Sequence, residues 1–227
     1  FAHHTGDYIR LAYADRLEGP WRVHEPGALR LCESHFSHHI ASPDVHVDHE
    51  RRQIRMYDHG EDEQQGQMTR VALSPDGLSF EAREEILGVS YFRAFQWDSW
   101  WYALAMPGIF YRSRDGLSGF ERGPKLFTDN MRHSALKIDG STLSVFYSDV
   151  GDCPEHIKLA TIDLTPDWTQ WKASEPVSVI EPVTEWEGAN LPLEPSIRGW
   201  APEPVRQLRD PAVFRESGRI YLLYSVM

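Results

Sequence analysis

Short runs of alternating apolar and polar residues, separated by acidic turns, recur along the whole chain. One pattern occurs four times: a short apolar strand, an acidic turn, and a second strand rich in aromatic and β-branched residues. Alternation with a period of two residues predicts β-strands, and the turn residues between the runs predict hairpins. These hairpins, named inner hairpins, comprise residues 45–60, 94–106, 135–149 and 212–226.

A second hairpin pattern alternates with the first along the chain. In it a strand ends near an Asp, a Leu follows within a few residues, and an aromatic residue opens the next strand. These outer hairpins begin at Tyr8, Met68, Gly108 and Ile157. The alternation predicts an all-β fold, a single β-propeller domain over residues 1–227 built from four-stranded antiparallel blades. An open β-sandwich is the alternative, although a sandwich does not require this regular repetition.

The hairpin order predicts three full blades and two half blades. The first half blade is the outer hairpin at the N-terminus, and the second is the inner hairpin at the C-terminus. An isolated two-stranded hairpin is at best marginally stable, and its edges invite aggregation. We therefore expect the two halves to close as one blade. In the alternative, strands of a fifth blade flank the chain.

Composition and charge exclude several partners and chemistries. The 227 residues carry a net charge of −11, which argues against nucleic acid and anionic membranes as partners. No segment approaches the roughly 18 apolar residues of a membrane span. Cys32 and Cys153 match no disulfide or metal spacing and are predicted to be free thiols. Neither a phosphate-binding glycine loop nor a Gly-x-Ser-x-Gly motif occurs. Compartment and oligomeric state stay open.

Residues 179–207 are expected to form a long loop. They contain five prolines, which are incompatible with a central strand, and loops of this length are usually functional or disordered. Trp186 and Trp200 are expected to tether the loop, with capping of a ligand as the alternative. Glu185, Glu187 and Glu194 are candidate acids that would reach over a site.

Four segments together resemble a known family. They are "YIRLAYADRLEGPW", "HIASPDVHVD", "RHSALKIDG" and "RDPAVFRESGRIYLLYS". They are similar to the five-bladed β-propeller glycosidases of the arabinanase, levansucrase and invertase type, particularly glycoside hydrolase family 43-like proteins. The resemblance covers nearly the whole chain. It implies a five-bladed fold and a sugar site at the mouth of the central channel. There the first strand of each inner hairpin, named the inner strand, begins.

The resemblance does not supply the family's three catalytic carboxyl groups. It implies a general base Asp on the first inner strand, an Asp that tunes pKa on the second, and a general acid Glu on the third. The first strand is absent from this sequence. On the next, Ser42 stands where the motif has Asp, and the segment containing Arg93 offers no Glu. The resemblance therefore implies the fold and leaves the catalytic machinery open.

Asp44 and Asp210 are the candidate catalytic residues. Glycoside hydrolysis needs two carboxyl groups about 5 to 9.5 Å apart, one of them with a raised pKa. Asp44 lies two residues after Ser42 and therefore on the same strand face, and Asp210 begins another inner strand. We expect the two carboxyl groups to converge within about 15 Å, with an arginine nearby. The candidate substrate-binding residues are His39, Arg93, Trp97, His133 and Arg209.

The histidines raise the question of a metal ion. Five lie between residues 35 and 49, and strand alternation places His46 on the same face as Asp44. No sharp ligand spacing such as His-Glu-x-x-His occurs. We predict no metal site or cofactor, with a divalent ion near His46 or His133 as the alternative.

Two functions remain. The first is a glycoside hydrolase-like protein that acts on a glycosidic bond of an oligo- or polysaccharide. The second is a non-catalytic sugar-binding or scaffold propeller that has lost the family's catalytic carboxylates. Whether the protein is an enzyme stays open, because fold analogy alone does not define function.

Overall fold

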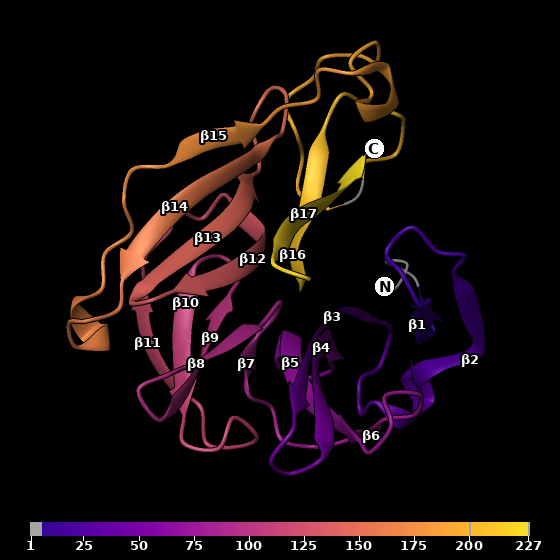
Figure 1. Ribbon diagram of the computed structural model, residues 1–227, viewed down its shortest axis with the longest axis vertical. Coiled ribbons are helices and arrows are strands. Elements are labelled where there is room, and N and C mark those ends of the chain that lie inside the picture. Colours follow the sequence, from indigo (N-terminus) through magenta and orange to yellow (C-terminus); the bar gives the residue numbers. More distant parts are fainter. Residues whose placement is uncertain (1–5, 200, 227) are drawn as a thin grey trace. The chain divides into compact units, whose positions relative to one another are not determined.

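The computed structural model describes residues 6–199 and 201–226, and the regular secondary structure in them is almost all β-strand (Figure 1). By its internal contacts the chain divides into two compact units. Unit 1 comprises Phe1–Ala94, Ser99–Ala105 and Arg112–Glu121, and unit 2 comprises Phe95–Asp98, Met106–Tyr111 and Arg122–Met227. Each unit is described by itself, and the single domain expected over residues 1–227 stays a prediction.

Three sheets have the antiparallel form of propeller blades, as predicted: two have four strands, and one has four strands in order with a fifth added. The first has the strand order β3-β4-β5-β6, with β7 also pairing with β5. The second has the order β11-β10-β9-β8, and the third β12-β13-β14-β15. The first sheet contains β3 (Ile40–Asp48), β4 (Gln53–Asp62), β5 (Gly66–Ser74), β6 (Glu81–Ala82) and β7 (Gly88–Val89). The second contains β8 (Arg93–Trp97), β9 (Trp100–Ala105), β10 (Ile109–Ser113) and β11 (Glu121–Lys125). The third contains β12 (Met131–Asp139), β13 (Thr142–Asp149), β14 (Ile157–Asp163) and β15 (Val177–Ile180).

The two predicted half blades are separate two-stranded sheets. Strand β1 (Tyr8–Tyr13) pairs with β2 (Arg22–Arg30), and β16 (Leu208–Glu216) pairs with β17 (Arg219–Val226). The first hairpin belongs to unit 1 and the second to unit 2, so their closure as one four-stranded blade stays a prediction. The hairpins themselves form as expected: each has its own turn, and its two strands pair along most of their length with one register shift.

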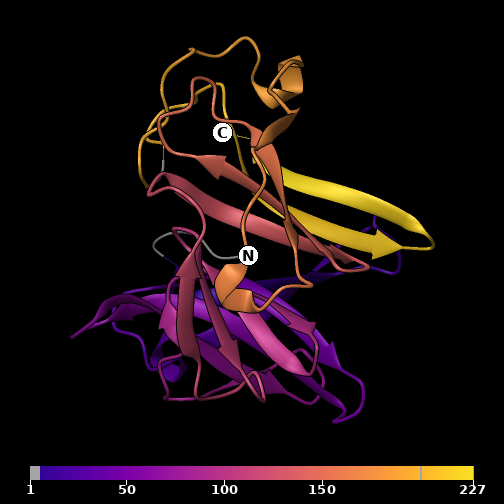
Figure 2. The same cartoon turned by 90° about the vertical axis from the view of Figure 1, so that its left-hand side faces the viewer.

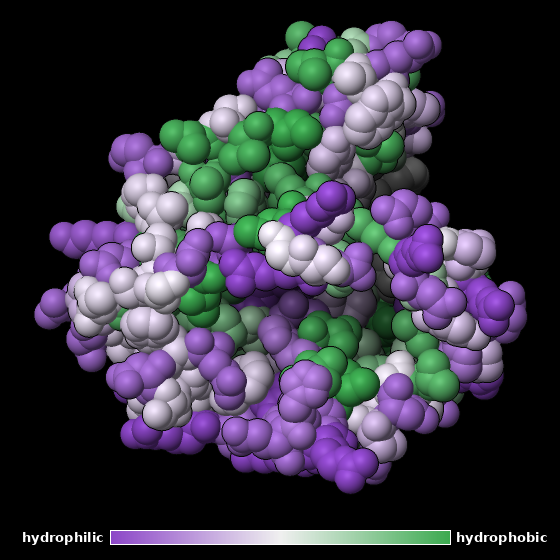
Figure 3. Space-filling view, viewed as in Figure 1, coloured by the Kyte–Doolittle hydropathy of each residue, from purple (hydrophilic) through white to green (hydrophobic). Residues whose placement is uncertain are grey.

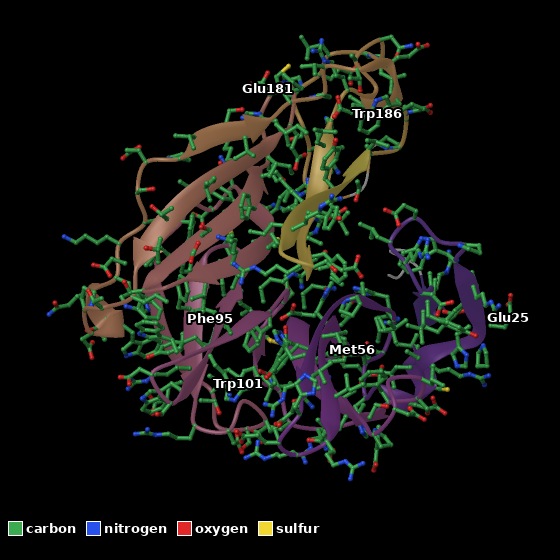
Figure 4. The ribbon with its side chains drawn as sticks, in the orientation of Figure 1. Glu25, Met56, Phe95, Trp101, Glu181 and Trp186 are labelled. Carbon is green, nitrogen blue, oxygen red and sulfur yellow. The ribbon has the colours of Figure 1, made fainter. Side chains whose placement is uncertain are left out.

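The core of unit 1 lies between β1, β2 and the sheet β3–β6. It gathers around Met56, labelled in Figure 4, with Ile9, Leu29, Ile40 and Ala72 all at most 2% exposed. Gly60 on β4 keeps this packing close. A Cβ at Gly60 would lie only 2.3 Å from the His39 carbonyl oxygen. The missing side chain lets the segment containing His39 cross directly over β4.

Unit 2 has an aromatic core and a neighbouring hairpin. Trp171 stacks on Phe95 with ring centroids 6.3 Å apart and meets Phe110 edge-on at 5.4 Å. Figures 1 and 2 both show the yellow hairpin β16–β17 beside β12, and these strands are in contact. On the outer surface, hydrophobic side chains gather over β14 and β15 in Figure 3, where Val177 and Val179 are exposed.

The long loop follows β15 as predicted, although Val179 and Ile180 still belong to that strand. It contains the short 3-10 helix η3 (Glu185–Glu187), closed by a capping box with Thr184. Trp186, labelled in Figure 4, stacks on Tyr224 of β17. This contact confirms that Trp186 tethers the loop, while Trp200 lies outside the described residues.

The remaining helical turns are η1 (Leu31–Glu33) and η2 (Trp168–Gln170). Among the described residues, no helix is long and apolar enough to cross a membrane. Cys32 and Cys153 are free and exposed, as predicted.

Candidate functional site

Three inner strands share a β-bulge near their starts. On β3, Ser42 and Pro43 lie opposite a single residue of β4, because Ala41 pairs with His59 and Asp44 pairs with Tyr57. The same two-against-one pattern occurs on β12 after Met131 and on β16 after Arg209. Bulges of this kind re-aim side chains and are frequent next to active sites.

Ser42 and Asp210 have the same backbone conformation within their bulges. Their φ angles are 50° and 49°, in the left-handed region that residues other than glycine seldom adopt, and each precedes a proline. The backbone thus supports the alignment of "IASPDV" with "LRDPAV", with Ser42 in the position of the motif Asp. Strain of about 1 to 3 kcal/mol at such positions is a common mark of functional sites.

Asp44 is held by its own unit in the ionised form. Its Oδ2 accepts a hydrogen bond from the Ala94 N–H at 2.7 Å and lies 2.8 Å from Nε2 of His46. Burial raises the pKa of Asp44, but His46, the charge of Arg93 and the Ala94 N–H together bring the pKa below its ordinary value. The contact with His46 confirms that strand alternation places the two side chains on one face.

Arg93 fixes the backbone around this carboxylate. Its guanidinium donates hydrogen bonds to the carbonyl oxygens of Ser42 at 3.2 Å and Phe92 at 2.9 Å. The side chain is partly exposed, so Arg93 remains a candidate for contacting a ligand.

Asp210 and His133 form the corresponding pair in unit 2. His133 Nδ1 contacts Asp210 Oδ1, and Ser225 Oγ donates to Asp210 Oδ2 at 3.0 Å. Burial raises the pKa of Asp210, but His133, Ser225 and Arg132 outweigh it and hold the pKa well below its usual range. The His133 side chain is 7% exposed and that of Asp210 is 47% exposed. The pair therefore presents an ionised carboxylate to solvent, oriented by a buried imidazole.

Arg209 has a structural role, and its direct binding of sugar stays a prediction. It is 2% exposed, its Nε lies 2.9 Å from Glu155 Oε2, and it donates to the Gly199 carbonyl at 2.9 Å. A further donor contacts the side chain of Gln207. With its guanidinium engaged on both sides, Arg209 locks the long loop to β16.

Glu155 is the central residue that the sequence analysis missed. It is fully buried, accepts a hydrogen bond from Ser148 Oγ at 2.6 Å, and lies 3.5 Å from an amino group of Arg132. Arg132 also donates to the carbonyl oxygens of Ile197 and Gly199. One signal pointed to such a residue: Arg209 stands in the strand-like segment "LRDPAVF", and an arginine buried there requires an anionic partner.

Trp97 and His39 remain candidates with defined positions. Trp97 donates its indole N–H to the Leu164 carbonyl at 3.0 Å, which anchors one edge of the ring in unit 2. His39 meets His59 edge-on, with ring centroids 5.7 Å apart, and His59 in turn lies 4.0 Å from the ring of Tyr91. Within residues 6–199 and 201–226, no three His, Cys, Asp or Glu side chains cluster to hold a metal ion.

Glu187 does not fit the expected role of a loop acid. Its carboxylate accepts hydrogen bonds from the backbone and hydroxyl of Thr184 and, at 2.7 Å, from the hydroxyl of Tyr224. These bonds, added to those from Val183, outweigh burial and lower the pKa of Glu187 to about 2. A carboxyl group ionised so strongly stabilises the loop and does not donate a proton near neutral pH.

Asp58 is protonated at neutral pH but buried away from solvent. It lies opposite the Ser42–Pro43 bulge and is 2% exposed, and its carboxyl oxygens have no hydrogen-bond partner in the described residues. Burial raises the pKa of Asp58 to about 8 despite the opposing charge of Arg70 on the neighbouring strand. A carboxyl group without access to solvent cannot deliver its proton to a bound sugar.

The two predicted catalytic carboxylates are thus alike in chemistry. Asp44 belongs to unit 1 and Asp210 to unit 2, so their convergence at one site stays a prediction. Both are ionised and both contact a histidine. A glycosidase requires one protonated carboxyl group beside one ionised group, and neither of these two residues supplies the protonated one.

The fold is that of the glycoside hydrolase family 43 enzymes, which confirms the resemblance expected from the sequence. No protein-family model matches the chain. CoXyl43, a GH43 β-xylosidase/α-arabinofuranosidase from a compost microbial metagenome, is 14% identical with a TM-score of 0.65 over 96% of this chain and 74% of its own. An endo-1,4-β-xylanase from Bacteroides thetaiotaomicron is 13% identical with a TM-score of 0.67 over 98% of this chain and 77% of its own.

A curated sequence relative places the chain more narrowly. Uncharacterized protein R118 of Acanthamoeba polyphaga mimivirus is 36% identical over 255 residues, which cover 100% of this chain and 72% of R118. The chain belongs to the protein family of R118.

We predict that Glu155→Gln lowers the free energy of unfolding by about 3 to 5 kcal/mol, because two buried arginines lose their counter-charge. The matched control is Glu121→Gln. Glu121 is 59% exposed and pairs with Arg112, and loss of an exposed ion pair costs under about 1 kcal/mol. Urea denaturation of both variants measures the difference, and equal midpoints would contradict the assigned role of Glu155.

Asp58 also predicts a pH dependence of stability. The folded state keeps a proton that the unfolded state loses above pH 4, so stability falls as pH rises towards the folded pKa of about 8. The slope reaches at most about 1.4 kcal/mol per pH unit. Asp58→Asn carries no titrating proton and should flatten the slope between pH 5 and 8. An unchanged slope in this variant, measured by urea denaturation across that range, would exclude a raised pKa at Asp58.

Proposed function

We propose that this chain is a glycoside hydrolase-like protein that binds an oligosaccharide through the carboxylates at the starts of its inner strands. The observation that carries the proposal is the repeated arrangement at the bulges of β3 and β16. At each, an ionised Asp is oriented by a histidine: Asp44 by His46 and Asp210 by His133. Ionised carboxylates are strong acceptors for sugar hydroxyl groups.

The neighbouring solved structures support carbohydrate as the ligand class. CoXyl43 was solved in complex with xylotriose, and a GH43_1 enzyme from Xanthomonas citri was solved in complex with xylose. Their similarity to this chain is one of fold, so the ligand is carried over as part of the proposal. Xylose- and arabinose-based oligosaccharides are the first ligands to test.

Binding is favoured over hydrolysis because of the protonation states of four carboxyl groups. Asp44 and Asp210 both have lowered pKa values, Glu187 is ionised within its capping box, and the protonated Asp58 is buried. No carboxyl group among these four combines a proton at neutral pH with access to a ligand.

Hydrolysis is a second candidate on one observation. Asp210 is 47% exposed and is oriented by the imidazole of His133. In this reading Asp210 would act as the base or stabilising group.

Calorimetric titration with xylo-, arabino- and fructo-oligosaccharides, run beside a hydrolysis assay on the same sugars, tests the proposal. We expect saturable binding without turnover. Asp210→Asn should weaken binding about ten-fold, because a charge-assisted hydrogen bond becomes a neutral one. Asp139→Asn is the matched control, since Asp139 is 76% exposed and forms an exposed ion pair with Lys137.

The outcomes separate the two candidates. Turnover that Asp210→Asn abolishes would establish the hydrolase and overturn simple binding. Neither binding nor turnover with any of the three sugar classes would contradict the carbohydrate proposal itself.

A further inference from the structure

Unit 2 contains a cavity of 470 Å³ away from the His133–Asp210 pair. It lies between the segment after β11, the end of β13, and the segment before β15. Its walls include Phe127, Thr128, Tyr147, Asp149 and Glu175. This volume falls within the range of small-molecule sites in proteins.

Tyr147 points a polar group into this cavity without using it elsewhere. Its side chain is 5% exposed, and its hydroxyl has no hydrogen-bond partner among the described residues. The ring is fixed by Phe127, which meets it edge-on with centroids 5.1 Å apart. The hydroxyl is not among the fully buried polar atoms, so it is accessible to a molecule in the cavity and can donate or accept a hydrogen bond there.

Asp149 supplies a second unused polar atom. Its Oδ2 lies 3.0 Å from Nζ of Lys158, while its Oδ1 is buried and accepts no hydrogen bond in the described structure. Asp149 and Tyr147 are two residues apart on β13, so their side chains lie on one face of the strand. The cavity therefore offers a carboxylate oxygen and a phenol on the same wall.

The charge of the cavity is negative. Lys158 is already shared between Asp149 and Asp152, from which it lies 2.6 Å, and Lys125 pairs with Asp129. Burial raises the pKa of Tyr147 to about 12; Asp149 adds to that rise, Lys158 opposes it, and Asp152 and Glu175 add further. A cation entering the cavity would meet carboxylates whose charge the two lysines only partly neutralise.

We infer that this cavity binds a small organic cation, namely a primary ammonium group on an apolar stem. The ammonium would donate hydrogen bonds to the Asp149 carboxylate and the Tyr147 oxygen, and the stem would pack on Phe127. Charge-assisted donation to a carboxylate and contact with aromatic rings are the interactions that bind such ligands. The inference does not depend on the carbohydrate proposal, because no residue of the cavity belongs to either Asp–His pair.

Benzylammonium is a suitable probe, with benzyl alcohol and benzoate as neutral and anionic analogues. Calorimetric or NMR titration of the whole chain should show that benzylammonium binds at least ten-fold more tightly than either analogue. Asp149→Asn should weaken that binding about ten-fold, and Tyr147→Phe about three-fold. Asp163→Asn is the matched control on the neighbouring strand β14 and should change nothing, because Asp163 is exposed and does not line the cavity.

A cavity-filling variant tests the site independently, in case Asp149→Asn loses binding only because its structure is lost. Ala173 also lines the cavity, so Ala173→Leu should abolish binding of the probe while thermal unfolding stays cooperative. Equal binding of benzyl alcohol and benzylammonium would overturn the inference. So would unchanged binding of benzylammonium by both Asp149→Asn and Ala173→Leu.

Discussion

The buried carboxylate of Glu155 is the interaction on which the candidate site of unit 2 depends. It attracts Arg132 of β12 and Arg209 of β16, and each arginine directly precedes a member of the His133–Asp210 pair. Both arginines also bind the Gly199 carbonyl of the long loop. A single buried charge therefore fixes two strands and a loop, and so fixes the contact between the imidazole and the exposed carboxylate. The arginines are buried because Glu155 compensates them, as an uncompensated buried charge would be strongly destabilising.

Unit 1 also contains a buried arginine whose charge is compensated by a carboxylate. Arg55 is fully buried on β4, lies 2.9 Å from Asp48 Oδ2, and has its guanidinium 4.1 Å from the ring centroid of Trp101. Asp44 lies four residues before Asp48 on β3 and contacts His46 and the Ala94 N–H in place of Arg55. In both units the structural ion pair is separate from the carboxylate offered to a ligand. That separation leaves Asp44 and Asp210 ionised and rigid, which suits recognition of hydroxyl groups better than proton donation.

Local sequence patterns predicted the structural features that depend on neighbouring residues. Alternation and acidic turns predicted the hairpins and three full blades, and the two-residue spacing of Asp44 and His46 predicted their shared face. The role of Arg209 and the importance of Glu155 depend on a contact between residues 54 positions apart, which no local pattern encodes. The raised pKa of Asp58 likewise arises from tertiary burial on β4. The two half blades were predicted as hairpins and form as such, and their closure as one blade stays a prediction because it depends on long-range geometry.

The central claim is that the carboxylates at the inner-strand bulges are ionised anchors for a ligand and not proton donors. The direct test is an NMR titration of the aspartate side-chain carboxyl carbons between pH 2 and 8, with Asp44→Asn and Asp210→Asn used to assign the two signals. The account predicts that both residues titrate below the usual value of about 3.9 for Asp. Titration of either residue between pH 5 and 7 would contradict the account, because that carboxyl group would then be a competent general acid.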